Sequence, residues 1–194
     1  MADEHRRASS SAPPTEASLH EAALAYLARF ATTEAGLRRI LGRRIDRWAR
    51  TVEDREAVAD QLAEAERAAA SVVAKLAALG AVNDAAYAES RARGLTRAGV
   101  SRRGIAARLA AKGVDPEVAR AALPEDAETE LAAALTLARR RRIGPFRAGP
   151  PPDAAGRMKE MGVLARAGFT QDTVRRAMDM DPEEAESRVL ALRR

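Results

Sequence analysis

The sequence predicts an all-α protein in which three tandem three-helix repeats form an elongated, curved helical array. Apolar residues make up 46% of the 194 residues, only 3% are aromatic, and alanine, the strongest helix former, supplies much of the apolar content. These apolar residues recur at helical spacing between capping residues and glycines that mark helix ends. In addition, residues 109–123 align without a gap on residues 164–178, and a fixed period of this kind is typical of stacked helical units.

The two copies match at their apolar and helix-ending positions. LAAKGVDPEVARAAL, from Leu109, aligns with LARAGFTQDTVRRAM, from Leu164, and leucine, alanine, glycine and arginine recur at the same places. Because a shared residue is expected to serve the common scaffold, we expect function to lie where the copies differ, as in Lys112 against Ala167, and in the arginines around each unit.

The first repeat is expected over residues 19–80, after a flexible lead at 1–18 that has no apolar core of a secretory signal. Its first helix begins near Leu19, Thr33 caps the second, and Gly80 ends the last. The inward residues of these helices are predicted to be Leu19, Ala23, Leu27, Phe30, Leu37, Ile40, Leu41, Val72, Val73, Leu76 and Leu79.

An insertion distinguishes the first repeat. TEAGLRRIL in this repeat overlays SRRGIAARL in the next, but Ile45 stands where a helix-ending glycine is expected. The second helix is predicted over Glu34 to Arg44, and we expect the first repeat to depart from the others by running on into an acidic-leaning insertion at about 46–67. Thr51 precedes Asp54 in a pattern that resembles a capping box, so an elongated, largely solvated helix is predicted from Asp54 onward.

The central repeat, residues 81–123, is predicted to contain three short helices. Gly99 and Gly113 separate them, Ser101 caps the second, and Asp115 before a proline opens the third. The inward residues of the first two helices are predicted to be Ala85, Ala88, Ala92, Leu95, Ile105 and Leu109.

The third repeat is expected over residues 124–180, and a C-terminal helix over 181–194. A helix at 126–142 precedes a loop at 143–152, whose four prolines and two glycines exclude a helix there. Two more helices follow in the repeat, and Gly168 ends the first of them. The predicted inward residues are Leu131, Leu135, Ala138, Met158, Met161 and Leu164.

Composition also narrows the function classes. The net charge of +5 and the pI of about 10.3 suit partners that carry phosphates or an acidic face. Cysteine is absent, His5 and His20 lack a metal-ligand spacing, and no phosphate-loop, dinucleotide-binding or zinc-protease motif occurs. We expect no catalytic residues, metal or cofactor, and a monomeric, cytoplasmic protein that does not insert into a membrane.

Basic residues gather in two places that we interpret as candidate surfaces for a partner or nucleic acid. One cluster surrounds the second helix of the central repeat, and the other follows the long helix of the third repeat. Solvated helix faces and favourable charge at a helix carboxyl end are the alternative explanations. The candidate residues are Arg97, Arg102, Arg103, Arg108, Lys112, Arg139, Arg140, Arg141, Arg142, Arg147 and Arg166.

Two nucleic-acid alternatives remain open at this point. Phe146 and Trp48 could stack on bases, although isolated aromatic residues beside helices more often pack in the protein. Residues 101–123 also have the look of a helix-turn-helix pair, but the unit recurs without a base-reading set of side chains, which favours a repeated scaffold.

The central segment resembles the RecX family of recombination regulators. Its marks are an apolar-Asn-Asp opening that leads to an aromatic residue (Val82 to Ala88), followed by G-x-S-x-x-x-I-x-x-x-L-x-x-K-G-V from Gly99 to Val114. ALAYLARFATTEAGLRRIL is similar to the first helix pair of the family, and RRRRIGPFR and LARAGFT resemble its third repeat. The likeness covers about residues 20–180, with Ile45, the insertion and Ala167 as departures.

This resemblance implies an all-helical modulator that performs no chemistry. It would bind the RecA filament, contact single- or double-stranded DNA through that filament, and restrain the ATPase, strand exchange and coprotease activities of RecA in DNA repair, recombination and the SOS response. A stand-alone basic protein that binds nucleic acid without RecA is the alternative, and a structural helical adaptor is a third possibility.

Overall fold

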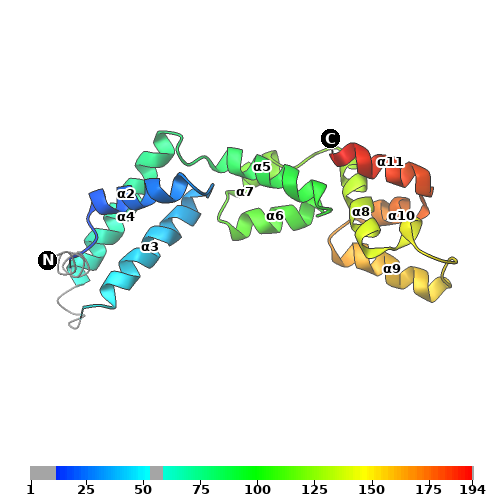
Figure 1. Ribbon diagram of the computed structural model, residues 1–194, viewed down its shortest axis with the longest axis horizontal. Coiled ribbons are helices and arrows are strands. Elements are labelled where there is room, and N and C mark those ends of the chain that lie inside the picture. The colour runs from blue at the N-terminus through cyan, green and yellow to red at the C-terminus, as the bar shows by residue number, and fades with distance from the viewer. Residues whose placement is uncertain (1–11, 53–58, 194) are drawn as a thin grey trace. The chain divides into compact units, whose positions relative to one another are not determined.

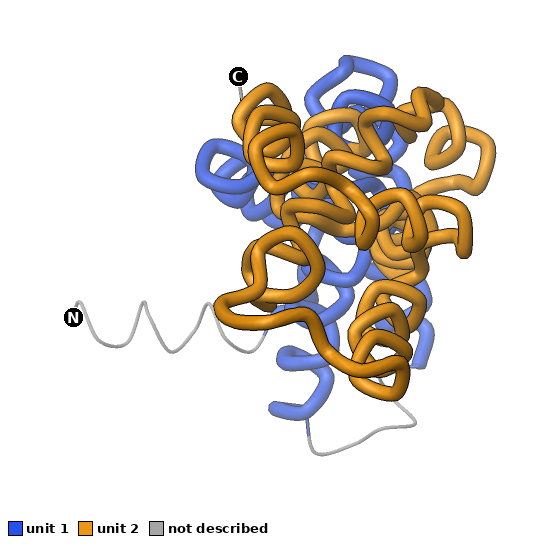
Figure 2. Tube along the Cα trace, turned by 90° about the vertical axis from the view of Figure 1, so that its right-hand side faces the viewer, with its two compact units in different colours: residues 1–87 blue, residues 88–194 orange. Residues whose placement is uncertain are grey.

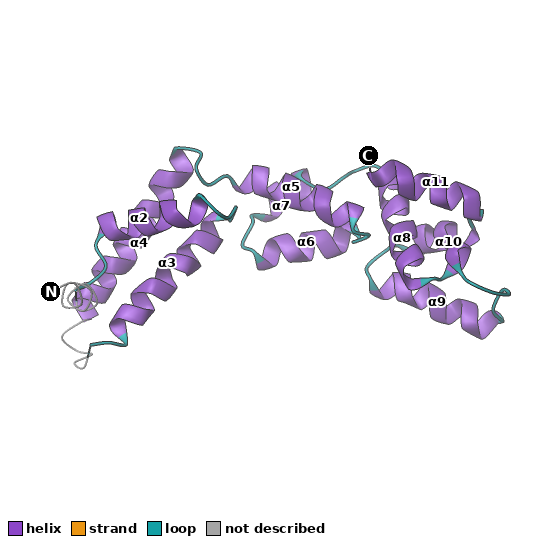
Figure 3. Ribbon diagram, in the orientation of Figure 1, coloured by secondary structure: helices purple, strands orange, loops and turns teal. Residues whose placement is uncertain are grey.

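The structure, a computed structural model, describes residues 12–52 and 59–193, and within these ranges it contains helices and no strand (Figure 3). The all-α prediction is therefore confirmed for the described residues. The chain divides into two compact units, residues 1–87 and residues 88–194 (Figure 2). The predicted division into three repeats distinguishes more parts than these two units, and it stays a prediction.

The first unit is built on α2 (Glu16–Leu27), α3 (Glu34–Ala49) and α4 (Ala59–Ala78) (Figure 1). All three helices contact one another, and α4 packs against both of the others. Thr15 and Thr33 cap α2 and α3 by accepting hydrogen bonds from backbone N–H groups three residues on. The buried core consists of Leu19, Ala23, Leu37, Leu41, Ile45, Ala65, Ala69, Val72, Val73, Leu76 and Val82.

Two predicted core residues of this unit are exposed instead. Phe30 is 50% exposed and Leu79 is 78% exposed. Each lies beyond the last residue of its helix, because α2 ends at Leu27 and α4 ends at Ala78. Helical spacing no longer fixes the direction of a side chain once the helix has ended. The predicted row of inward residues was therefore continued too far at the ends of α2 and α4.

The second helix ends later than its predicted end at Arg44. Helix α3 runs through Ile45 to Ala49, and both Ile45 and Trp48 are buried. Trp48 is 6% exposed and packs inside the protein, which leaves no face open for base stacking. The predicted helix start after Thr51 cannot be followed further, because residues 53–58 lie outside the described ranges, as do residues 1–11 of the predicted lead.

Three short helices make up the central segment, as predicted: α5 (Asp84–Arg97), α6 (Arg102–Ala111) and α7 (Pro116–Ala121). Gly99 and Gly113 adopt positive φ angles of 77° and 80°, which explains glycine at these helix ends. The buried apolar residues of these three helices and the loops between them are Ala88, Ala92, Ile105, Leu109, Val114 and Ala119. The predicted inward residue Ala85 is exposed instead.

The remaining helices form the rest of the second unit. They are α8 (Ala127–Arg141), α9 (Ala154–Arg166), α10 (Gln171–Asp179) and α11 (Pro182–Arg193). Helix α8 is the central one, because it packs against each of the other three. Its eight buried residues explain this position, because all of them except Glu130 are alanine or leucine and they lie on several faces of the helix.

Two predictions for this part of the chain were wrong. The proline- and glycine-rich loop contains a short 3₁₀ helix, η1 (Gly144–Phe146), because proline is compatible with the first turn of a helix. The predicted inward residue Met158 is 66% exposed, whereas Leu164, six residues further along α9, is fully buried. Phe146 packs against the core that surrounds α8 and is a packing residue.

The repeated segment has the same helix–glycine–helix arrangement in both copies, although α10 is longer than α7. Helices α6 and α9 end in positive-φ glycines, Gly113 and Gly168, and both leucines at the first position of the repeat are buried. Val114 and the corresponding Phe169 are also buried. The repeat is therefore architectural, as expected from the sequence.

Candidate functional site

Four arginines line one groove of about 450 Å³ in the second unit: Arg108, Arg140, Arg141 and Arg166. They come from three helices, since Arg108 lies on α6, Arg140 and Arg141 lie at the end of α8, and Arg166 ends α9. Within the described residues, no acidic side chain lines this groove and no ion pair involves any of the four. We call it the arginine groove.

Small residues allow the arginines to converge. Gly99, Val100 and Gly104 line the groove beside them. A Cβ atom on Gly104 would lie 2.9 Å from Val100 Cγ1, and one on Gly99 would lie 2.9 Å from the backbone nitrogen of Leu137. Glycine at position 99 therefore lets the segment before α6 approach α8 closely, and glycine at position 104 leaves room for the side chain of Val100.

The side chains of Arg140 and Arg166 make contacts that fix their positions beside the groove. The guanidinium of Arg140 donates a hydrogen bond of 3.2 Å to the carbonyl oxygen of Ala98. The guanidinium of Arg166 lies over Gly162, where a Cβ atom would be 3.0 Å from Nη1. Each of the four arginines also lies in the last turn of its helix, where the negative end of the helix dipole favours a cation.

A polar junction between the start of α6 and the end of α9 fixes the groove. The Ser101 hydroxyl donates a hydrogen bond of 2.6 Å to the carbonyl oxygen of Ala167 and accepts one of 3.1 Å from the N–H of Gly104. Ser101 is fully buried. Gly168 leaves room for this contact, because its Cβ atom would lie 2.8 Å from the serine oxygen. One side chain thus caps α6 and joins it to the end of α9.

Glu130 completes the junction on the side of α8. Its carboxylate, 8% exposed, accepts the N–H of Arg102 at 3.0 Å and 3.2 Å, so it binds the first turn of α6. Burial raises the pKa of Glu130, and the hydrogen bond from Arg102 offsets part of that rise. Burying a charge is costly, and the hydrogen bond that this carboxylate accepts from Arg102 holds the start of α6 against α8.

The arrangement is suited to binding an anion with several charges. Guanidinium groups present planar sets of donors that match phosphate or carboxylate oxygens. The helix dipoles favour the cations only by about 0.3–1 kcal/mol each and do not cancel their charge. Four arginines without acidic partners therefore leave a strong positive potential in the groove, and the repeated phosphates of a nucleic-acid backbone would match it.

Several of the predicted site residues are engaged elsewhere. Arg139 pairs with Glu186 of α11, and Arg147 pairs with Glu160 of α9. Glu160 also accepts the N–H of Gly144, and Arg147 holds the pKa of this carboxyl below its ordinary value. These two arginines tie the loop and α11 to the helices around them.

The other predicted residues are distributed over the same unit. Arg102 and Arg103 line a hollow of about 530 Å³ that also contains Glu125, Glu130, Asp172 and Arg176, so its charge is mixed. Arg97 lines a third hollow, between α5 and the end of α11. Lys112 and Arg142 are exposed C-cap residues, of α6 and α8. The four consecutive arginines 139–142 thus separate into an ion pair, two groove residues and a helix cap.

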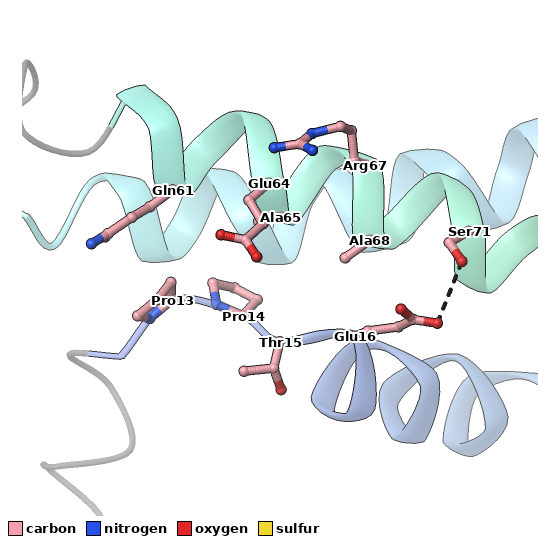
Figure 4. Close-up of a pocket in the computed structure, with 10 residues that line it drawn as sticks. All are labelled: Pro13, Pro14, Thr15, Glu16, Gln61, Glu64, Ala65, Arg67, Ala68 and Ser71. Atoms are coloured by element: carbon pink, nitrogen blue, oxygen red, sulfur yellow. Dashed lines mark hydrogen bonds between the residues drawn. The ribbon is translucent and has the colours of Figure 1, made fainter.

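A hollow in the first unit lies between the residues before α2 and helix α4 (Figure 4). Pro13 and Pro14 form one wall, and Gln61, Glu64 and Arg67 project from α4. Acidic and basic side chains both line this hollow, and Glu16 is already bound by Ser71 and Lys75 of α4. It lacks the uniform charge of the arginine groove.

Sequence reasoning missed the residues that assemble the groove. Ser101 and Gly168 were recognised as a helix cap and a helix end, but their contact joins residues far apart in the chain. Glu130 was not recognised at all. The available signal was an acidic residue directly before the apolar run from Leu131 to Leu135 of α8, which is buried as well.

Within the described residues, no cluster of three or more metal-binding side chains occurs, and none of the helices is long and apolar enough to cross a membrane.

Comparison with known proteins identifies the chain's relatives. The family model described as RecX, second three-helix domain, matches residues 83–123. A regulatory protein RecX from Myxococcus xanthus (strain DK1622) is 39% identical over 167 residues, which cover 84% of this chain and 86% of the relative. Another, from Agrobacterium fabrum, is 43% identical over 106 residues, 55% of this chain and 56% of that protein.

A solved structure agrees with the helical architecture. The crystal structure of RecX from Lactobacillus salivarius aligns with a TM-score of 0.60 over 89% of this chain and 97% of that chain, at 21% sequence identity. This likeness concerns the fold, whereas the Myxococcus relative extends over most of both sequences. The chain belongs to the RecX family of regulatory proteins.

Proposed function

We propose that this protein is a modulator of the RecA recombinase that binds the RecA–DNA filament and restrains its ATPase, strand exchange and coprotease activities in DNA repair and recombination. Its membership of the RecX family supports a regulatory role. The proposal adds the partner, the negative sign of regulation and action as a monomer in the cytoplasm. No cofactor is required, because the protein acts by binding.

The arginine groove is the single structural observation that supports this proposal most directly. A filament carries DNA, and four cations without acidic neighbours suit its phosphates. The contact would position the protein without reading sequence, since guanidinium contacts to phosphates carry no base information. Arg108, Arg140, Arg141 and Arg166 would bind phosphate, while Ser101 and the residues around it would hold the helices in place.

A titration of the protein into RecA assembled on single-stranded DNA tests this function. We expect ATP hydrolysis and strand exchange to fall at amounts of protein well below the amount of RecA, because one bound molecule on a filament affects many protomers. If inhibition requires saturating protein and is abolished by free DNA, the protein acts as a stand-alone nucleic-acid binder, and the proposal is wrong.

A further inference from the structure

A separate hollow in the second unit is apolar, with a positively charged rim. It has a volume of about 320 Å³ and lies between α5, the residues that follow α7, and the end of α11. Its apolar walls are partly exposed, and its rim carries two arginines but no acidic side chain among the described residues. The lining residues used in the argument are Arg93, Thr96, Arg97, Leu123, Pro124 and Leu192.

A buried hydroxyl in this hollow has no partner. Thr96 is 5% exposed, and its Oγ1 is the buried side-chain polar atom that makes no hydrogen bond among the described residues. A buried hydroxyl without a partner costs about 1–3 kcal/mol. Threonine in a helix populates two side-chain rotamers, so rotation about Cα–Cβ can aim the hydroxyl into the hollow that Thr96 lines.

The charges on the rim define the kind of group that fits beside this hydroxyl. Arg97 forms no ion pair with any described residue, and Arg93 pairs only with the exposed Glu89 at 3.5 Å. Both guanidinium groups can therefore bind a carboxylate from outside. The walls, Leu123, Pro124 and Leu192, suit an aliphatic side chain and contain no aromatic ring on which a nucleic-acid base could stack.

The size of the hollow distinguishes a peptide from a larger ligand. Pockets for cofactors and drug-sized molecules occupy about 300–1,000 Å³, so this hollow is at the lower limit and holds one or two side chains. We propose that it is a docking site for an acidic peptide segment of a protein partner, with one aliphatic side chain against Leu123 and Leu192, a polar backbone or side-chain group at Thr96, and an acidic residue at Arg97. This site would act whether or not the arginine groove binds DNA.

Fluorescence anisotropy with a labelled peptide and the full-length protein tests the proposal. The probe has one leucine flanked on each side by two acidic residues, and two control peptides replace either the leucine by alanine or the acidic residues by glutamine. We expect saturable binding of the probe and weaker binding of both controls. Binding of all three peptides alike, or of none, would overturn the proposal.

Substitutions at Thr96 separate binding from stability. Thr96→Val keeps the shape of the side chain and removes the hydroxyl. We expect it to lower the affinity for the probe peptide about five-fold, as for one lost hydrogen bond. The midpoint of thermal unfolding should stay the same or rise, because no unpaired hydroxyl is then buried. Thr96→Ser keeps the hydroxyl and should bind within about two-fold of the wild type. Equal affinity of the valine variant and the wild type would contradict the assigned role of the hydroxyl.

A matched arginine substitution and a competitor complete the test. Arg97→Gln should lower the affinity for the probe peptide about ten-fold. Arg91 lies on the same helix but outside the hollow, so Arg91→Gln should leave this affinity unchanged. A thymidine oligonucleotide should not displace the probe. If it does, and if substitution of the arginine groove abolishes peptide binding, the peptide binds the groove, and the docking site proposed here does not exist.

Discussion

Glu130 allows a direct measurement of the free energy that it costs to bury a carboxylate at the contact between α6 and α8. Its buried carboxylate binds the first turn of α6 through the N–H of Arg102. Burial raises its pKa, so the folded protein favours the protonated form more than the unfolded chain does. The stabilising contribution of protonation is present at acidic pH and is lost as the pH rises through the raised pKa.

Glu130→Gln should therefore affect stability in a pH-dependent way. The amide keeps an acceptor for the N–H of Arg102 and carries no charge, so at neutral pH the variant should be more stable than the wild type by on the order of 1 kcal/mol. The difference should shrink as the pH falls through the raised pKa of Glu130. Thermal unfolding followed by circular dichroism from neutral to acidic pH measures this. A variant that is less stable at neutral pH would show that the ionised carboxylate contributes more than its burial costs.

At the scale of the elements, helix ends determine most of the structure that the sequence predicted correctly. Capping Thr33 and Ser101, Asp115 before a proline, and positive-φ Gly113 are local signals, so the starts of α3, α6 and α7 and the end of α6 could be read directly. The errors at Phe30 and Leu79 arose where a stripe was continued past a helix end. Contacts between helices, such as that of Ser101 with Ala167, leave no local signal and could not be predicted.

Alanine substitutions at two helix-ending glycines distinguish the cost of a left-handed backbone conformation from the cost of disturbing the contact between Ser101 and the end of α9. Both Gly80 and Gly168 have a positive φ, but a Cβ atom on Gly80 would meet nothing within 4 Å, whereas one on Gly168 would meet Ser101 Oγ. Gly80→Ala should cost about 1–2 kcal/mol through the left-handed conformation alone. Gly168→Ala should cost at least about 1 kcal/mol more, because it also disturbs the junction.

Urea unfolding of the two variants measures this difference, and Ser101→Ala provides the control. In the Ser101→Ala background the clash at position 168 is relieved, so the two alanine substitutions should then have more similar effects. Equal destabilisation by the two substitutions in the wild-type background would mean that the Ser101 contact tolerates displacement and does not fix α6 against α9.

At the scale of the whole molecule, charge placement matters more than net charge. The sequence indicated basic clusters, but the folded chain separates their members: Arg139 and Arg147 are in ion pairs, while Arg140 and Arg141 meet Arg108 and Arg166 in the groove. Arg139 to Arg142 have different surroundings because four consecutive residues project around a helix in different directions. The family could be recognised from the central segment alone, whereas the site required the packing of three helices.

The central claim is that the arginine groove makes the phosphate contacts through which the protein binds the RecA–DNA filament. A groove variant changes Arg108, Arg140, Arg141 and Arg166 to glutamine. A control variant with the same net charge changes four exposed arginines of the same unit that, within the described residues, form no ion pair and lie outside the groove: Arg91, Arg103, Arg142 and Arg175. Circular dichroism would establish that both variants remain folded.

The most direct test is the affinity of both variants for RecA filaments on single-stranded DNA, measured over a range of salt concentrations. The groove variant should bind more weakly and inhibit ATP hydrolysis less, and the slope of log affinity against log salt should become shallower by about three, at about 0.7 per lost phosphate contact. The control variant should retain most of its affinity and of its slope. Equal losses in the two variants, or an unchanged slope in the groove variant, would contradict the claim.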